Sequence, residues 1–249
     1  MSPMFGRLSI PASVVSVARS FGGGLRDLLD PWCCLVCRAP DDPSAVPGLC
    51  PTCSRELPWR FGPSDRSPLE VGADRFARIV VALRFEPPVD RLVYQLKYGG
   101  QRNAALPLAF ALGEAIALAA DGAGRTGGER LPELLIPVPM HWLKRWVRGG
   151  DHAAWLALAL GRSLRLPVAT GALTRRRATA AQGGARSLDH RLAQVRGAIA
   201  VAQRRSIRGR HVALIDDVVT SGATATACAA ALRSAGAASV SLYAVAGNG

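Results

Sequence analysis

The sequence predicts an α/β protein, a doubly wound parallel sheet preceded by a small cysteine module. Three observations predict this fold class. From residue 78 onward, apolar strand-like runs alternate with helix-like segments, which is typical of a parallel sheet covered by helices. One of these runs leads into two carboxylates, a small-residue loop and an Ala-rich segment. Upstream, two Cys-x-x-Cys pairs lie in a stretch too small to build its own apolar core.

The length of 249 residues suffices for one α/β domain and a small accessory module. We expect an N-terminal segment over 1–30, the cysteine module over 31–60 and the α/β domain over 75–249. No stretch approaches 18 uninterrupted apolar residues, so we expect no membrane span. The N-terminal segment lacks the features of a signal peptide, and a cytoplasmic protein is the default expectation. The sequence predicts no oligomeric state.

The net charge of +13 is concentrated in one part of the chain. Between His141 and Arg210 there are 15 Lys and Arg but only two acids, a difference that equals the whole excess. A basic block of this kind favours a polyanionic partner, either a substrate bearing pyrophosphate or a nucleic acid backbone. For most of these arginines, a solvated face in an Arg-rich composition remains the alternative.

Four of the six cysteines have the spacing of a zinc knuckle. Two Cys-x-x-Cys pairs, twelve residues apart, favour a closed tetrahedral and therefore structural Zn²⁺ site, and disulfides are disfavoured in the cytoplasm. The expected ligands are Cys34, Cys37, Cys50 and Cys53. Cys33 is an alternative to Cys34, because Cys33-x3-Cys37 is also possible. Cys228 is expected to be a small buried residue.

The elements of the α/β domain follow from apolar periodicity and from glycine breaks. A strand over 78–85 precedes a helix over 89–98, which ends at Gly99-Gly100. Further along, we expect an apolar helix (106–120), a short buried strand (134–138), a helix (151–166), a brief strand near 172–173, two strands (198–202 and 212–215), a helix (224–235) and a last strand (239–246). The Arg-, Gly- and Ser-rich stretch up to Arg196 is expected to be a mobile loop.

The stretch from His211 to Thr224 combines features that suit a phosphorylated sugar. An apolar strand leads to Asp216 and Asp217, and a small-residue loop then precedes the N-terminus of a helix. Free backbone N–H groups and the helix dipole suit a phosphate, whereas paired carboxylates suit sugar hydroxyls or hydrated Mg²⁺. The alternative is an ordinary strand–loop–helix unit of another nucleotide-binding fold.

Ligands of doubly wound sheets bind beyond the carboxyl ends of the strands. This rule places three features on one rim. They are the loop after Val138, the Arg175–Arg191 loop and the segment from Asp216 to Thr224.

The His211–Thr224 stretch resembles the phosphoribosyl-pyrophosphate (PRPP) signature of type I phosphoribosyltransferases. The chain as a whole resembles the ComF family, competence-associated proteins with a phosphoribosyltransferase-like domain behind an N-terminal zinc module. The motifs that carry the resemblance are Leu25 to Cys53, Lys97-Tyr98-Gly99-Gly100, Pro137-Val138-Pro139 with Arg145, Arg148 and Gly149, and the set Arg175, Arg177, Thr179, Gln182 and Arg191. Together they cover about residues 25–246.

The resemblance implies a site that binds PRPP with Mg²⁺ and transfers phosphoribose to an unknown acceptor with release of pyrophosphate. The 5′-phosphate would be held by Thr220, Ser221, Gly222, Ala223 and Thr224, and the ribose hydroxyls by Asp216 and Asp217, of which Asp217 is the better catalytic candidate. Pro137, Val138 and Pro139 would form the pyrophosphate loop, and Arg175 and Arg177 would close over it. For Lys97, a phosphate contact and an ordinary surface helix end are equal alternatives.

A second reading is a single-stranded DNA-binding competence protein that uses the PRPP fold without transferase activity, together with other DNA-uptake proteins. Trp142 and Trp146 are the candidates for base stacking near the arginines. A third reading is an inactive phosphate-binding relic. The chain departs from the family pattern at Gly150-Asp151-His152 and at Gln194, in the region that would face an acceptor.

Overall fold

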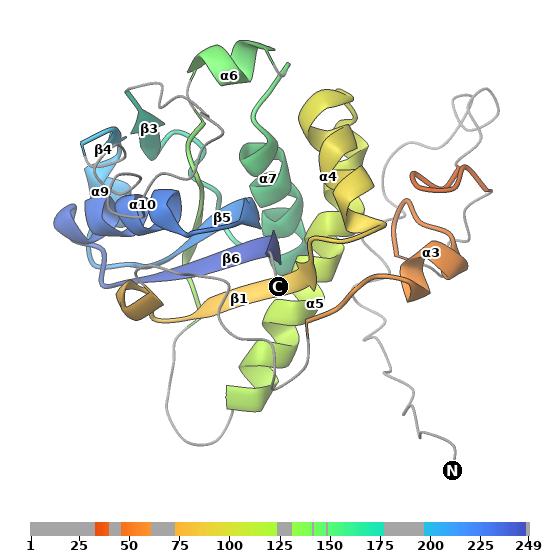
Figure 1. Ribbon diagram of the computed structural model, residues 1–249. Coiled ribbons are helices and arrows are strands. Elements are labelled where there is room, and N and C mark those ends of the chain that lie inside the picture. The colour runs from red at the N-terminus through yellow and green to blue at the C-terminus, as the bar shows by residue number, and fades with distance from the viewer. Residues whose placement is uncertain are drawn as a thin grey trace. The chain divides into compact units, whose positions relative to one another are not determined.

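The structure is a computed structural model, and it describes residues 33–39, 46–60, 73–123, 131–140, 142–147, 149–176 and 197–247 (Figure 1). Residues 33–249 form one compact unit. The predicted N-terminal segment and most of the predicted arginine loop lie outside the described residues.

The main sheet has four parallel strands in the order β1-β6-β5-β2. These strands are β1 (Ile79–Arg84), β2 (Leu134–Pro137), β5 (His211–Val219) and β6 (Ser239–Gly247). Strands β5 and β6 are central and almost fully buried, as their near-continuous apolar sequences predict. The predicted parallel α/β fold class is therefore confirmed.

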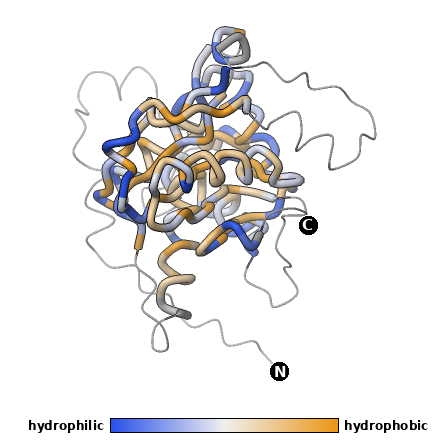
Figure 2. The backbone as a smooth tube through the Cα atoms, turned by 90° about the vertical axis from the view of Figure 1, so that its left-hand side faces the viewer, coloured by the Kyte–Doolittle hydropathy of each residue, from blue (hydrophilic) through white to orange (hydrophobic). Residues whose placement is uncertain are grey.

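The pleat of the central strands separates two apolar cores. Ala213 and Ile215 of β5 belong to one core, with helices α4 (Val89–Tyr98), α5 (Ala105–Ala123) and α7 (His152–Leu164). Val212 and Leu214 belong to the other core, with α10 (Ala223–Ser234). The helices thus cover both faces of the sheet (Figure 1), and the hydrophobic stretches of the chain gather inside this layered structure (Figure 2).

Helix α5 alone among the described segments is long and apolar enough to cross a membrane by length and composition. Half of its apolar window is buried, however, and Leu108, Leu112 and Ile116 pack in the core shared with β1 and α7. The core helix of a folded domain has the same length and composition, so this segment is only weak evidence for a membrane span.

The brief strands predicted near 172–173 and 198–202 do not join the main sheet. They form β3 (Leu173–Arg175) and β4 (Ile199–Val201), which pair with each other in antiparallel register. Three residues each, with little full burial, are too few for an inner parallel strand. Short helices α6 (Trp142–Val147) and α9 (Arg204–Ile207) and the 3-10 turns η2 (Ala73–Arg75) and η3 (Arg102–Ala104) were not predicted.

The cysteine module packs directly on the edge of the sheet. Beyond its helix α3 (Pro51–Arg55), Trp59 forms a bridge with Leu83 of β1, and Arg84 donates its N–H to the carbonyl of Pro58 at 2.8 Å. Its apolar residues Leu35 and Leu49 are buried in the same core as α4 and α5. The module therefore covers the edge strand β1 and shares the hydrophobic interior of the domain.

Candidate functional site

The two carboxylates lie inside β5 rather than beyond its end. The strand was predicted to stop at Ile215, but its ladder with β6 continues, with Asp216 opposite Ala244 and Val219 opposite Gly247. Successive side chains of a strand point to opposite faces, so Asp216 and Asp217 are directed towards different helical layers. Lys97 nevertheless acts on both carboxylates, because it is paired with Asp217 and its charge also lowers the pKa of Asp216.

Asp217 faces the layer that contains α4 and α7. Its Oδ1 atom lies 2.9 Å from Nζ of Lys97, at the C-terminal end of α4, and also accepts the N–H of Val218 at 2.6 Å. The side chains of Lys97 and Asp217 are only 20% and 10% exposed. Lys97 is therefore directed into the site, in contact with one of the predicted sugar-binding carboxylates.

Asp216 faces the layer that contains α10 and β3. Burial and the neighbouring charge of Asp217 raise the pKa of Asp216 to about 7, against the opposing effects of Lys97, the N–H of Asp217 and Arg175. Burial lowers the pKa of Arg175, and the nearby carboxylate of Asp216 opposes that effect. Asp216 and Arg175 are thus electrostatic neighbours although one is on β5 and the other on β3.

The loop after β5 forms a compact turn at the start of α10. Ser221, Gly222 and Ala223 are buried, Thr224 is half-buried and Thr220 is exposed. Gly222 adopts a left-handed conformation, with φ at +78°, and no side chain caps the helix behind it. The first N–H groups of α10 are thereby left for a ligand, which suits a phosphate.

The predicted pyrophosphate loop lies beside the carboxylates. Pro137 of β2 pairs with Ile215, one residue before Asp216, and Val138 donates its N–H to the carbonyl of Ile215 at 2.9 Å. Pro137, Val138 and Pro139 are all buried. The parallel pairing of β2 with β5 thus brings this loop to the rim that holds Asp216.

The structure therefore brings together Lys97, the 137–139 loop, Arg175, the two carboxylates and the 220–224 loop. The remaining predicted residues, Arg148, Arg177, Thr179, Gln182, Arg191 and Gln194, lie outside the described residues.

A third carboxylate, Asp151, belongs to the same neighbourhood, although the sequence placed it only in the segment that would face an acceptor. Asp151 caps α7 by accepting the N–H of Ala154 at 3.1 Å, and Nε of Arg145 lies 4.0 Å from its Oδ2. Burial raises the pKa of Asp151, and the charge of Asp217 adds to that effect. An Asp just before a helix is a signal for a cap, but sequence alone did not indicate its proximity to Asp217.

The two positions beside Asp151 build a packed aromatic corner. His152 is fully buried and contacts Trp155 edge-on, with ring centroids 5.6 Å apart. The guanidinium carbon of Arg102 lies 4.9 Å from the centroid of the Trp155 ring. Gly150 lies so close to Trp155 that a Cβ atom there would be 2.0 Å from the ring. The segment where the chain leaves the family pattern is therefore tightly packed.

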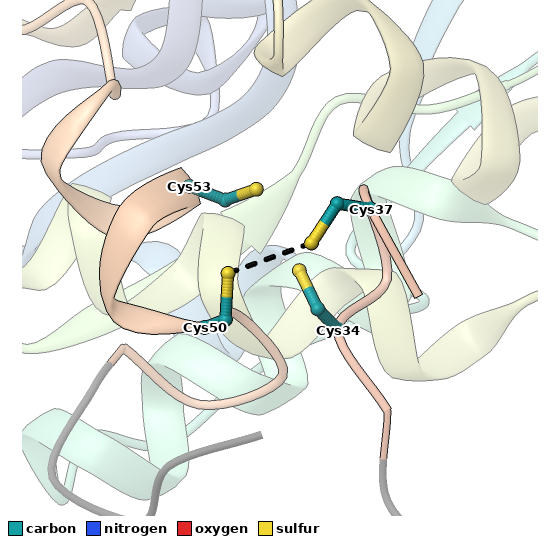
Figure 3. A group of neighbouring side chains, drawn as sticks. All are labelled: Cys34, Cys37, Cys50 and Cys53. Carbon is teal, nitrogen blue, oxygen red and sulfur yellow. Dashed lines mark hydrogen bonds between the residues drawn. The ribbon is translucent and has the colours of Figure 1, made fainter. Parts of the chain in front are cut away.

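The four cysteines of the two pairs converge (Figure 3). The Sγ atoms of Cys34, Cys37, Cys50 and Cys53 all lie within 4.8 Å of one another, and those of Cys37 and Cys50 are 3.5 Å apart. A tetrahedral zinc site with Zn–S bonds of about 2.3 Å requires sulfur separations of roughly 3.8 Å. The arrangement fits that requirement, and it includes Cys34 but not Cys33.

Cys34 also has the electrostatic character of a metal ligand. Burial opposes its ionisation, but hydrogen bonds from the backbone of Cys37, Cys50 and Val36 outweigh it and lower the pKa of Cys34 to about 7. The pKa of Cys53 is raised, mainly by burial, and that of Cys37 is also raised, so the tendency to ionise without a metal belongs to Cys34 and not to the whole cluster.

Exposed aromatic side chains occur on α4, a position that the sequence analysis did not predict. Tyr94 and Tyr98 are 65% and 57% exposed, and their ring centroids lie 5.0 Å apart. Their i, i+4 spacing on the helix was the available signal. Of the two predicted stacking residues, Trp146 is 81% exposed, while the side chain of Trp142 lies outside the description.

No protein-family model matches the chain. Among solved structures it is similar to a glutamine PRPP amidotransferase from B. subtilis (17% identity, TM-score 0.37, 61% of this chain and 30% of that one). It is also similar to a hypoxanthine phosphoribosyltransferase from Trypanosoma cruzi (18% identity, TM-score 0.34, 59% and 74%). Both likenesses have TM-scores below 0.5, so the family assignment rests on the relatives in sequence.

The relatives in sequence cover between two thirds and nine tenths of the chain. The DNA utilization protein YhgH of Escherichia coli O157:H7 is 32% identical over 225 residues, which is 86% of this chain and 96% of that protein. Competence protein F of Haemophilus influenzae is 29% identical over 170 residues, 68% and 72% of the two chains. The chain therefore belongs to the family of DNA utilization protein YhgH and Competence protein F. This is the ComF family, which the motifs of the sequence had indicated.

Proposed function

We propose that this protein binds PRPP at the carboxyl edge of its sheet and acts as a phosphoribosyltransferase linked to DNA uptake. The observation that carries the proposal is the junction of β5 and α10. There, two adjacent carboxylates precede a buried small-residue turn whose helix N-terminus no side chain caps. This order of groups matches the order of ribose and 5′-phosphate in the ligand.

Each neighbouring element has a role in this proposal. The 220–224 loop holds the 5′-phosphate through backbone N–H and hydroxyl groups, and Asp216 and Asp217 bind the ribose 2′- and 3′-hydroxyls. The 137–139 loop lies where the pyrophosphate would bind, and Arg175 and Arg177 would neutralise the charge that builds on this leaving group. Lys97 would contribute positive charge beside the ribose-binding carboxylates, because it contacts Asp217.

The carboxylate pair also suits a hydrated Mg²⁺ that arrives with PRPP. Mg²⁺ prefers oxygen ligands and keeps several waters, and Asp216 and Asp217 offer such oxygens without forming a closed cage. When bound, the ion would supply positive charge against the pyrophosphate.

Calorimetry with PRPP, with and without Mg²⁺, tests the proposal. The wild-type chain is expected to bind Mg·PRPP, whereas Asp216→Asn combined with Asp217→Asn is expected to abolish binding, because each amide keeps only one acceptor oxygen and both negative charges that favour the ribose hydroxyls and Mg²⁺ are lost. Asp74→Asn, an exposed carboxylate on η2, is the matched control and should bind as the wild type does. Unchanged affinity in the double variant would refute the site. Pyrophosphate release with a panel of bases on the same sample then tests transfer.

We also propose that Cys34, Cys37, Cys50 and Cys53 hold a structural Zn²⁺. Four thiolates close the coordination shell, which leaves no open position for catalysis. The small size of the module supports this role, because metal ligation offsets the entropy of ordering a segment with few apolar residues.

A second candidate function is binding of single-stranded DNA, and the tyrosine pair on α4 favours it. Successive bases stack on exposed aromatic rings, and arginines beside them contact the phosphates. Tyr94 and Tyr98 are exposed, with exposed Arg91 one turn before them and Arg102 shortly after the helix. The name of the relative from Escherichia coli, a DNA utilization protein, is consistent with this activity.

Fluorescence anisotropy with a labelled oligo-dT tests this second candidate. Tyr94→Ala combined with Tyr98→Ala is expected to weaken binding by tenfold or more, because stacking contributes about 1–3 kcal/mol per base. The salt dependence should stay as in the wild type, since the phosphate contacts remain. The Tyr94→Phe, Tyr98→Phe variant keeps the rings and should retain affinity. If the alanine variant binds as tightly as the wild type, this surface is not the DNA site.

A further inference from the structure

Lys97 is placed in the site by the body of α4 and not by its own contacts alone. Leu92, Val93 and Leu96 anchor the helix in the core, and Gln95 donates from Nε2 to the carbonyl of Leu35 at 2.8 Å. The lysine lies in the last turn, where the negative end of the helix dipole favours a cation. Its ammonium group is therefore held in a fixed position relative to β5.

The contact with Asp217 is an ion pair with restricted access to water. The two charged atoms are 2.9 Å apart, and the side chains are 20% and 10% exposed. A pair of this kind interacts more strongly than an exposed one, because solvent screening is reduced. Removal of the lysine charge would leave a largely buried carboxylate without its counter-ion.

The need for positive charge at this position extends beyond Asp217. The charge of Asp217 raises the pKa of both Asp216 and Asp151, so the three carboxylates lie close to one another. Among the residues that the structure describes, the cations directed towards them are Lys97 at Asp217, Arg175 near Asp216 and Arg145 at 4.0 Å from Asp151. Of these, Arg145 is largely exposed, so Lys97 is the principal cation on the Asp217 side.

We propose that Lys97 is the counter-ion of Asp217 in the absence of ligand. Its positive charge neutralises part of the carboxylate charge that a divalent cation would otherwise neutralise when the ligand is bound. Lys97 thereby sets how strongly the site depends on a divalent cation. This inference rests on the proposed PRPP site only for the identity of the ligand that brings the cation. The contact between Lys97 and Asp217, and the effect of Lys97 on the nearby carboxylates, do not depend on which ligand binds.

Binding of Mn²⁺ alone tests the inference without any activity measurement. The probe is Mn²⁺ added to the zinc-loaded full chain, with free Mn²⁺ followed by electron paramagnetic resonance, because Mn²⁺ prefers oxygen ligands. Lys97→Met is expected to bind Mn²⁺ about tenfold or more tightly than the wild type, since one unit of competing charge is lost at close range. Lys97→Arg keeps the charge and should resemble the wild type.

Further variants locate the effect. Lys97→Met combined with Asp217→Asn is expected to lose the gain, whereas Arg205→Met, which removes an exposed charge on α9, should leave Mn²⁺ binding unchanged. Lys97→Gln is a second neutral variant in case Lys97→Met does not fold, and should show the same gain. The inference is overturned if the neutral variants show no gain, if the gain survives loss of Asp217, or if the wild type already binds Mn²⁺ tightly.

PRPP titrations separate this inference from the proposed function. If PRPP binds, added Mg²⁺ should raise the affinity of Lys97→Met by a larger factor than that of the wild type. An equal loss of affinity with and without Mg²⁺, with no gain in Mn²⁺ binding, would make Lys97 a direct phosphate contact and overturn the counter-ion role. If no protein binds PRPP, the proposed function fails, and the Mn²⁺ experiment still decides the role of Lys97.

Discussion

Asp216 and Asp217 are neighbours in sequence, but the pleat of β5 gives them different environments. Asp217 is in direct contact with the ammonium group of Lys97, whereas Asp216 is buried beside the charge of Asp217 and is affected by Lys97 and Arg175 only from further away. The pKa of Asp216 rises to about 7 as a result. Asp216 can therefore be partly protonated near neutral pH, which is unusual for an aspartate.

This raised pKa predicts a pH-dependent stability. From about pH 4 to about pH 7, the unfolded chain releases the proton of Asp216 while the folded protein keeps it, so the free energy of unfolding falls as the pH rises. Asp216→Asn removes this effect and is expected to be more stable than the wild type at pH 8, on the order of 1–3 kcal/mol. The difference should shrink towards pH 4.

Melting temperatures of the two proteins between pH 4 and pH 8 check this expectation. Asp74→Asn, which removes an exposed carboxylate, should show no change of the difference with pH. A difference between Asp216→Asn and the wild type that is the same at every pH would contradict the raised pKa.

Residue identities alone indicated much of the site but not its contacts. Asp216, Asp217 and the 220–224 loop were predicted because they lie in one local motif, in which spacing along the chain sets spacing in space. The Lys97–Asp217 pair and the approach of Asp151 depend on how α4 and α7 pack on the sheet. Such contacts between distant segments have no local signature, so they required the structure.

At the level of elements, the predicted helix over 89–98 coincides with α4, because its apolar spacing and the following glycines are unambiguous local signals. The end of β5 was predicted too early, since the acids interrupt the apolar pattern while the ladder with β6 continues. The pairing of β3 with β4 was not predicted, because which strands pair depends on tertiary contacts rather than on propensity.

Two adjacent cysteines of the module provide a test of the zinc site, because Cys34 belongs to the cluster and Cys33 does not. Cys34→Ser removes a sulfur from the cluster, whereas Cys33→Ser changes the adjacent cysteine outside it. We expect Cys34→Ser to lose bound zinc and Cys33→Ser to retain about one zinc per chain. Elemental analysis of the purified proteins gives the answer. Equal zinc content in both variants would show that the cluster is not the metal site.

The contact between α7 and its preceding loop predicts a second pair of variants. Gly150→Ala places a Cβ atom 2.0 Å from the Trp155 ring, which Arg102 covers, and is expected to cost about 1–3 kcal/mol of stability. Gly113→Ala, in the middle of α5, meets only Leu160 at 3.7 Å and should be neutral or stabilising by up to about 1 kcal/mol. Denaturant unfolding measures both. Equal stabilities would mean that the corner at Trp155 is loosely packed.

On the scale of the whole molecule, the cysteine module and the sheet share one hydrophobic core. Leu35, Leu49 and Leu57 lie in the same buried cluster as residues of α4, α5 and β1. Gln95 links the module to α4 by a hydrogen bond, and Lys97 of the same helix contacts Asp217. One helix therefore contacts both the proposed metal module and the proposed ligand site.

This shared core predicts that metal removal destabilises the whole unit rather than the module alone. Chelation of zinc is expected to leave a single unfolding transition in calorimetry, with a midpoint lowered by about 5–10 °C, since a few kcal/mol shift a domain of this size by that amount. The chelator should not lower the midpoint of Cys34→Ser further, because that variant already lacks the metal. If a separate low-temperature transition appears and the main midpoint stays unchanged, the module unfolds independently. In that case α4 would not transmit the state of the module to Lys97, and PRPP affinity should be the same before and after chelation.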